Sequence, residues 1–287
     1  MKMSNHYVGH NFKHIFDQIT ADFLKHAHPV HPLNWQGQDV SKRREMTSYE
    51  LMNVTLSHPI DNYQAAGIEP EGLAVVLGSN WPWCEDHFQE RVCGYPINPG
   101  TEWQNWPWNR SASTFLSETG RFNHNYMERY WPKYAGGYGD PVKYASELEG
   151  QDLGQPLHGI RNEYGDLNDL VDQLIADPYN RQSWIPIFHP EDVGEVVGGR
   201  KPCTLGYQFL VRNGKLHVWY PLRSCDFIRH FRDDIYLTIR LAQWVLEQCK
   251  TRGILEDWDG VTLGSYSMHC TSLHVFTNDY IQMGGRP

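Results

Sequence analysis

The sequence has 287 residues, of which 40% are hydrophobic and 13% aromatic, so it can bury a large core. Its net charge of −9 at pH 7 argues against a general nucleic-acid binder, which needs a basic face to displace counterions from phosphates. No stretch approaches the roughly 20 apolar residues of a membrane helix, and the N-terminus lacks the apolar segment of a signal peptide. The six cysteines form no CxxC pair, which favours reduced thiols. We therefore expect a soluble cytoplasmic protein that binds neither nucleic acid nor membrane.

The first half of the sequence predicts one clear helix and an irregular lobe. Apolar residues at three- and four-residue spacing predict a helix over 11–26, namely Phe12, Ile15, Phe16, Ile19 and Phe23. Residues 30–45 read as a loop. Two Asn-Trp-Pro-Trp segments, at 80–83 and 105–108, indicate an aromatic-rich lobe without regular helix, because proline disrupts helix interiors. Packing is the favoured role for these tryptophans, and a platform for stacking a base is the alternative.

The second half is more regular. We predict a helix over 167–175 ending before Asp177-Pro178, strands at 183–188 and 204–211, and a returning strand at 216–220. The strands at 204–211 and 216–220 flank Asn213-Gly214, a strong hairpin signal. A long apolar helix over 235–248 and a short strand near 275–276 complete the pattern. Helices and strands mix throughout, so the class is α/β (or α+β), and residues 1–287 show no domain boundary.

Four short motifs follow one another in the same half. They are Asp177-Pro178-Tyr179-Asn180-Arg181, Pro202-Cys203 followed by Gln208-Phe209, Arg223-Ser224-Cys225-Asp226, and His274-Val275-Phe276. In this order, with the hairpin and the long helix, they resemble the thymidylate synthase superfamily, most like its deoxycytidylate hydroxymethylase branch. The resemblance covers about 157–277, a recognisable catalytic core, whereas about 1–150 is divergent. It implies a thymidylate synthase-like fold, with a mixed β-sheet flanked by helices and a sheet-to-sheet homodimer.

The chemistry of such enzymes gives Cys203 a role. Carbon 5 of a pyrimidine is a poor nucleophile, but a thiolate that adds to carbon 6 makes it enamine-like and able to attack a one-carbon electrophile. Positive charge must favour the thiolate, and Arg223 and Arg181 can supply it while their guanidinium groups bind a phosphate. A cysteine that begins a strand is by itself more often a small core residue, and Arg223 by itself a surface ion pair. The ordered motifs favour the nucleophile.

The resemblance also assigns the remaining candidate site residues. The arginine that matches Arg181 reaches in from the partner subunit, which implies an obligate homodimer. Ser224 would bind phosphate, Gln208 would line the pocket, Asp226 would hydrogen-bond near the base, and His274 would contact the sugar hydroxyl. A packed histidine is the alternative for the last of these. Arg43 or Arg44, in a mobile loop, would be a further phosphate ligand.

Asp234 occupies the position that would choose the base. Family members that use uracil carry asparagine there, and members that hydroxymethylate deoxycytidylate carry aspartate. A carboxyl group suits cytosine, because it accepts from the amino group and, when protonated, donates to the ring nitrogen. Asp233 is the competing candidate. A helix N-cap is the alternative role for Asp234.

The resemblance implies 5,10-methylenetetrahydrofolate as the one-carbon donor and a pyrimidine deoxynucleoside monophosphate as the substrate. The favoured reading is a deoxycytidylate 5-hydroxymethyltransferase that serves phage DNA modification in an infected bacterial cell. Methylation of deoxycytidylate or deoxyuridylate, and a non-catalytic nucleotide-binding protein, are the alternatives. Ser111 matches the position of the family's catalytic glutamate, for which Glu118 or Glu128 could substitute, and the family's folate-closing tail is not matched after His274.

The histidines near the N-terminus are weighed separately. His6, His10 and His14 recur every four residues, a spacing that would place them on one face of a helix. A metal site needs a defined ligand set with supporting partners, which this pattern lacks. We therefore expect a solvated face and no metal.

Overall fold

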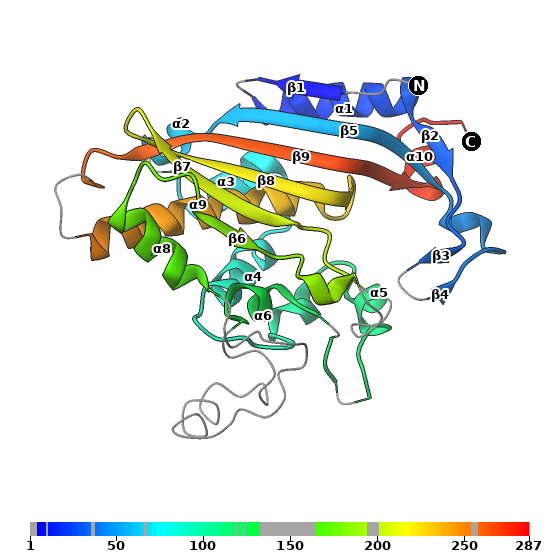
Figure 1. The fold of residues 1–287 in the computed structure, drawn as a ribbon. Coiled ribbons are helices and arrows are strands. Elements are labelled where there is room, and N and C mark those ends of the chain that lie inside the picture. Colours follow the sequence, from blue (N-terminus) through cyan, green and yellow to red (C-terminus); the bar gives the residue numbers. More distant parts are fainter. Residues whose placement is uncertain are drawn as a thin grey trace.

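A mixed sheet of seven strands forms the centre of the computed structural model (Figure 1). The structure describes residues 5–9, 11–35, 38–65, 68–118, 120–122, 124–132, 165–193, 201–253 and 258–286. The strand order is β1-β5-β9-β8-β7-β6, and β2 pairs with β5 outside this path. The strands are β1 (Asn5–Val8), β2 (His28–Val30), β5 (Ser48–Pro59), β6 (Trp184–Pro186), β7 (Gly206–Arg212), β8 (Lys215–Asp226) and β9 (Thr262–Phe276). A separate ribbon pairs β3 (Asn34–Trp35) with β4 (Gln38–Asp39).

The direction of the strands brings distant motifs together. β7 and β8 form an antiparallel hairpin, and β8 runs parallel to β9, so that Ser224 lies beside Ser272 and Asp226 beside His274. The predicted hairpin turn is confirmed, since Asn213 and Gly214 both have positive φ, 53° and 70°. The last strand was predicted as short, which is wrong: β9 has 15 residues and pairs with both β5 and β8.

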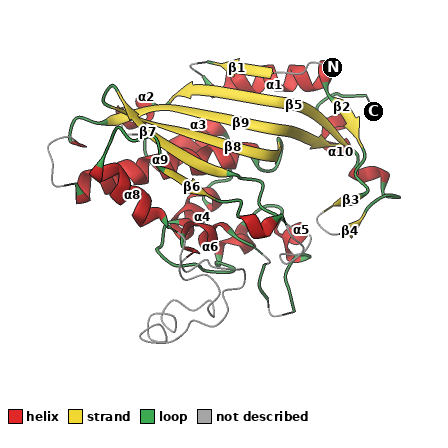
Figure 2. Ribbon diagram, in the orientation of Figure 1, coloured by secondary structure: helices red, strands yellow, loops and turns green. Residues whose placement is uncertain are grey.

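Helices lie behind the sheet and below it in the view of Figure 2. They are α1 (Phe12–His26), α2 (Asp61–Ala65), α3 (Pro70–Leu77), α4 (Trp83–Arg91), α5 (Asn109–Ser113), α6 (Tyr126–Tyr130), α8 (Leu167–Ala176), α9 (Phe231–Arg252) and α10 (Thr277–Gln282). The long helix α9 packs on β8 and β9 and is contacted by α3, α4 and α8. The predicted helices over 11–26, 167–175 and 235–248 are confirmed, the last with an extra turn before it that carries Asp234.

Alternation along the strands defines two faces of the sheet. Buried side chains such as Leu56, Tyr207 and Tyr266 belong to the core. The opposite face carries half-buried or exposed polar and tryptophan side chains, with a hydrogen bond between Ser57 and Ser267 at 3.3 Å and a ring contact between Trp184 and Trp219 at 5.7 Å. This second face is less completely covered by the described residues than the first.

The aromatic lobe departs in part from its prediction. A regular helix, α4, begins directly after Pro82, because proline interrupts a helix interior but not its start. Trp83 is buried, and the ring of Trp106 stacks on His230 at 4.8 Å, which confirms packing for these two tryptophans. Trp108 instead lines a cavity beside α9.

A buried ion pair fixes α6 to the segment after β6. Arg129 donates two hydrogen bonds to Asp192, at 2.7 and 2.8 Å, and both side chains are completely buried. Removing one partner leaves the other as a buried charge without a counter-ion, so we expect Arg129→Met to lower the free energy of unfolding by about 3–5 kcal/mol. The double variant Arg129→Met/Asp192→Leu should recover part of this loss in urea denaturation. An unchanged denaturation midpoint in Arg129→Met would contradict the importance of the pair.

Candidate active site

Cys203 lies where the chain enters β7 and is held against β8. The Arg223 backbone N–H donates to the Cys203 carbonyl at 2.9 Å, and the Leu205 N–H donates to the Pro221 carbonyl at 2.9 Å. These bonds continue the β7–β8 pairing past the end of the hairpin. They place the predicted nucleophile directly beside the Arg223-Ser224 motif, 20 residues further along the chain.

Arg223 and Ser224 form a chain of hydrogen-bond donors toward the thiol. The Ser224 hydroxyl donates to the Cys203 sulfur at 3.6 Å, and Arg223 Nη1 donates to the Ser224 oxygen at 3.2 Å. Arg223 also donates to the carbonyls of Pro202 and Lys201, each at 2.9 Å. The guanidinium group is thereby fixed in the loop that carries Cys203.

Accessibility separates Cys203 from its neighbours. Cys203 is partly exposed, whereas Cys225 and Cys270 are buried in the same region. Burial raises the pKa of both buried thiols well above the ordinary value, and nearby Asp234 adds to this. Of these three cysteines, only Cys203 combines access for a substrate with hydrogen-bond donors at its sulfur.

Asp234 lies in the first turn of α9 and faces this cluster. The helix begins at Phe231 with His230 as N-cap, so Asp234 is not the N-cap. The Cys225 thiol donates to Asp234 Oδ2 at 3.4 Å. Burial raises the pKa of the Asp234 carboxyl to about 7, although the charge of Arg91 and the Cys225 hydrogen bond lower it. A carboxyl group that titrates near neutrality can both donate and accept a proton under working conditions.

Asp233, the competing candidate, has a different environment. Its two oxygens accept hydrogen bonds from the Asn80 backbone N–H at 2.9 Å and the Asn80 side-chain amide at 2.7 Å. This contact joins the start of α9 to the segment between α3 and α4. The geometry favours Asp234 over Asp233 as the group that faces Cys203 and its neighbours.

A network of tyrosines and one arginine, which the sequence did not point to, completes the cluster. The Thr204 hydroxyl lies 2.9 Å from the hydroxyls of both Tyr126 and Tyr220. The Tyr220 ring stacks on Tyr207 with centroids 4.9 Å apart. The Arg91 guanidinium lies 4.0 Å from the centroid of the Tyr126 ring. Thr204 and Tyr220 flank recognised motifs, whereas Arg91 and Tyr126 belong to the divergent region and offered no signal.

Asp226 shapes the turn between β8 and α9. Its Oδ1 accepts from the backbone N–H groups of Ile228 and Arg229, at 2.9 and 3.0 Å, and its Oδ2 accepts from the Arg229 side chain at 2.7 Å. Arg229 also pairs with Asp279 at 2.8 Å. Asp226 thus supports the start of the helix that presents Asp234.

The other predicted site residues lie on β7, on β9 and in segments outside the sheet. Arg181 is exposed, and its side chain makes no hydrogen bond or ion pair with another described residue. Gln208 donates to the Arg181 carbonyl at 3.1 Å. The half-buried His274 ring lies 5.6 Å from Phe276, and burial lowers its pKa. Arg43 and Arg44 are exposed in the segment before β5, and Arg43 pairs with Glu45 at 2.9 Å.

The proposed substitutes for a catalytic glutamate occupy other places. Glu128 is buried and accepts from Asn98 at 3.0 Å and Arg121 at 2.9 Å, and Glu118 is exposed. The N-terminal histidines do not share a helix face, because His6 lies on β1 and His14 on α1, while His10 is outside the described residues. Within the described part of the chain, no three His, Cys, Asp or Glu side chains group as a metal site, and no helix is long and apolar enough to cross a bilayer.

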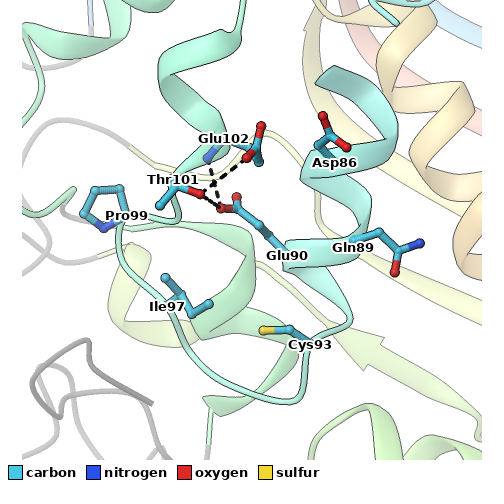
Figure 3. A pocket seen from close by; sticks show the side chains of 8 residues that line it. All are labelled: Asp86, Gln89, Glu90, Cys93, Ile97, Pro99, Thr101 and Glu102. Atoms are coloured by element: carbon cyan, nitrogen blue, oxygen red, sulfur yellow. Dashed lines mark hydrogen bonds between the residues drawn. The ribbon is translucent and has the colours of Figure 1, made fainter. Parts of the chain in front are cut away.

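Two cavities differ in their suitability for an anionic ligand. One, of about 570 Å³, lies beside α4 and presents the carboxylates of Asp86, Glu90 and Glu102 (Figure 3). These carboxylates would repel a phosphate. The other, of about 300 Å³, lies at the start of α9 and is lined by Asn80, Trp108, Phe227, Ile228, Arg229, Arg232 and others. Its lining combines aromatic rings and Arg232 with the Asp233 carboxylate, while Arg229 is paired with Asp226 and Asp279.

The fold and the cysteine loop agree with one family. The family model for thymidylate synthase matches residues 100–282, and the chain belongs to the thymidylate synthase family. The match includes Cys203, the Arg223-Ser224 motif, Asp234 and His274. It begins well before position 157, so more of the chain than the predicted core is related to the family.

Two relatives match part of the chain. The chain is 32% identical over 126 residues to "Deoxyuridylate hydroxymethyltransferase" of Bacillus phage SP01, covering 42% of this chain and 30% of the relative. It is 26% identical over 119 residues to "Putative thymidylate synthase" of Methanocaldococcus jannaschii, covering 39% of this chain and 49% of the relative. The matched stretches thus span half or less of each relative.

Proposed function

We propose that the chain is a one-carbon transferase acting at carbon 5 of a pyrimidine nucleoside monophosphate, and specifically a dCMP 5-hydroxymethyltransferase. The observation that carries the proposal is the pairing of two groups. One is the partly exposed Cys203 thiol, held by Ser224 and Arg223, and the other is the Asp234 carboxyl, held by Cys225. The first can attack a ring, and the second can read its cytosine edge.

Cys203 and Asp234 together carry out the proposed first step. The Cys203 thiolate forms a bond to carbon 6. The π pair of the C5=C6 bond then forms a C4=C5 double bond, and the π pair of the C4=N3 bond moves onto N3. The Asp234 carboxyl gives its proton to N3. The carboxylate that results accepts from the exocyclic amino group. Carbon 5 then has enamine character, and Arg223, Ser224 and the partner's arginine at position 181 hold the phosphate.

The implied donor, 5,10-methylenetetrahydrofolate, would supply the one-carbon unit when bound. The cavity at the start of α9 could hold its ring system, because Trp108 offers a stacking surface and Arg232 offers positive charge. Its volume of about 300 Å³ lies at the lower end for small-ligand sites. Asn80 and Asp233, which line it, join it to the helix turn of Asp234.

A homodimer formed through the sheet accompanies this proposal. The half-covered sheet face carries Trp184, Trp219 and the Ser57–Ser267 pair, and Arg181, whose side chain pairs with no other described residue, lies at its edge beside Gln208. A second copy would cover this face, and its Arg181 would reach the phosphate of the first. The pyrimidine deoxynucleoside monophosphate is the only other partner proposed.

The test is the mass of the product. The protein would be incubated with dCMP, dUMP or CMP, each with and without methylenetetrahydrofolate. We expect dCMP to gain the elements CH₂O only with the folate, and dUMP and CMP to remain unchanged. No product from any nucleotide, with folate binding intact, would refute the proposed activity.

Uracil is the second candidate base, and one comparison favours it. The phage relative is named for deoxyuridylate, although the match covers only 42% of this chain and 30% of the relative. A CH₂O gain on dUMP alone would support that reading, and a CH₂ gain on either nucleotide would indicate methylation. The Asp234 carboxyl favours cytosine, because uracil-using members of the family carry asparagine at the matching position.

A further inference from the structure

Thr204 directly follows the proposed nucleophile and carries a hydroxyl group into the core, where the residue is 0% exposed. Its Oγ1 lies 2.9 Å from the hydroxyl of Tyr126 on α6 and 2.9 Å from the hydroxyl of Tyr220 on β8. A buried hydroxyl is unfavourable unless it is hydrogen-bonded, whereas valine would fill the same space without that requirement. The hydroxyl groups of Tyr126, Thr204 and Tyr220, here called the hydroxyl triad, therefore form a specific polar contact in an apolar surrounding.

The backbone at Cys203 is held on both sides. On the side before it, the Arg223 guanidinium donates to the carbonyls of Lys201 and Pro202, and the Arg223 backbone N–H donates to the Cys203 carbonyl. On the side after it, the Thr204 side chain joins the hydroxyl triad. The triad thus fixes the chain immediately after the residue that carries the sulfur.

Helix α6 contacts this stretch at two points. Tyr126 and Arg129 are three positions apart, so their side chains leave α6 on the same side. The Arg129 guanidinium donates to the Ile187 carbonyl at 3.3 Å, and the Ile187 N–H donates to the Leu205 carbonyl at 2.9 Å. The helix therefore reaches Thr204 directly through Tyr126, and Leu205 indirectly through Ile187.

The Tyr126 side chain is itself fixed by α4. The Arg91 guanidinium carbon lies 4.0 Å from the centroid of the Tyr126 ring, and Arg91 Nε donates to His87 Nε2 at 3.1 Å. The Arg91 carbonyl accepts a hydrogen bond from the indole nitrogen of Trp131 at 2.9 Å, which joins α4 to the end of α6. The ring of Tyr126 is held on one side, and its hydroxyl is presented to Thr204.

We propose that Tyr126 and Thr204 are positioning residues for the Cys203 nucleophile and act through the hydroxyl triad. Neither hydroxyl hydrogen-bonds the sulfur, which accepts from Ser224 at 3.6 Å. The triad instead fixes the backbone that carries the sulfur, and a misplacement of about 1 Å in such a group can cost about 100-fold in rate. The inference rests on the proposed function for the reaction that the sulfur performs, whereas the fixation of the Cys203 backbone does not depend on it.

Amide hydrogen exchange measures this fixation without a substrate. The Arg223 amide, which donates to the Cys203 carbonyl, and the Leu205 amide report the opening of this stretch. Tyr126→Phe and Thr204→Val each remove one hydroxyl and keep the shape of the side chain, so they should speed exchange at both amides by roughly five- to tenfold. Thr204→Ser, which keeps the hydroxyl, should retain slow exchange. Unchanged exchange in both Tyr126→Phe and Thr204→Val would overturn the proposal.

Two comparisons separate the triad from general loosening of the core. Tyr7→Phe removes another buried tyrosine hydroxyl, which donates to Asp22 at 2.7 Å, and should leave both reporting amides unchanged. The double variant Tyr126→Phe/Thr204→Val should exchange no faster than the faster single variant, because both substitutions remove the same hydrogen bond. Additive effects, or faster exchange that extends equally to the middle of α9, would contradict a specific role for the triad.

The kinetic readout tests whether this fixation positions the nucleophile. In Thr204→Val, kcat for dCMP should fall by at least about tenfold while KM stays within about twofold, because the proposed phosphate and base contacts are unchanged. Thr204→Ser should restore most of kcat. Unchanged kcat in Thr204→Val, despite faster exchange at the reporting amides, would overturn the positioning role. If the unmodified protein turns over no pyrimidine nucleotide, the proposed function fails, and hydrogen exchange still decides whether the triad fixes Cys203.

Discussion

Replacing Cys203 by alanine should abolish turnover while leaving nucleotide binding nearly intact. The phosphate and base contacts proposed for Arg223, Ser224 and Asp234 do not involve the sulfur, whereas the bond to carbon 6 does. Loss of a nucleophile that acts as part of a concerted group lowers kcat by at least about 10⁴-fold. Product formation by mass spectrometry and dCMP affinity by calorimetry would measure the two effects separately.

Cys225→Ala is the matched control for this prediction. Cys225 is a buried cysteine close to the same cluster, but its thiol donates to Asp234 and is not accessible to a substrate. The variant should keep turnover within about tenfold, the effect of losing one hydrogen bond to a charged group. Full turnover by Cys203→Ala, or a complete loss of turnover in Cys225→Ala alone, would contradict the assignment of Cys203 as the nucleophile.

Changing Asp234 to asparagine should reverse the choice of base. An asparagine amide donates to the carbonyl of uracil and accepts from its N3–H, but it cannot protonate N3 of cytosine. A site built for one hydrogen-bonding edge rejects the other because buried polar groups are left unpaired, by as much as about 10⁴- to 10⁵-fold. We therefore expect the ratio of kcat/KM for dCMP over dUMP to fall by at least about 100-fold.

The neighbouring carboxylate supplies the comparison. Asp233→Asn alters the same turn of α9, yet its contact is with Asn80, so the preference for dCMP should persist even if the protein is less stable. Both variants would be assayed with both nucleotides at one pH near neutrality. A change of base preference in Asp233→Asn, with none in Asp234→Asn, would transfer base reading to the other residue.

Sequence reasoning was most successful where local pattern decides structure. The buried positions of α1, the end of α8 before Asp177 and the Asn213-Gly214 turn follow from spacing, capping and backbone preference, and the structure contains all three. The proximity of Ser224 to Cys203 followed from the family resemblance. The extent of β9 did not follow from pattern, because alternating serines and histidines on its half-covered face weaken the hydrophobic signal of a long strand.

The parts of the candidate site that the sequence did not predict are those that only tertiary contacts bring together. Arg91 and Tyr126 are about 110 and 80 positions from Cys203 in the sequence, and neither lies in a recognised motif. Their roles depend on how α4 and α6 pack against the sheet, which no local window encodes. The same limit explains why Glu128 was considered a catalytic candidate, although its partners, Asn98 and Arg121, make it part of the lobe's own packing.

The attachment of Asp234 to a helix, and of Cys203 to a strand entrance, has a consequence for how such proteins diversify. The proposed nucleophile and its donors depend on β7 and β8, whereas the group proposed to read the base lies in the first turn of α9. Under the proposed function, a single substitution in that turn would change the nucleotide used without altering the sheet that holds Cys203. A lineage could exchange one DNA base chemistry for another through α9 alone and keep the same nucleophile throughout.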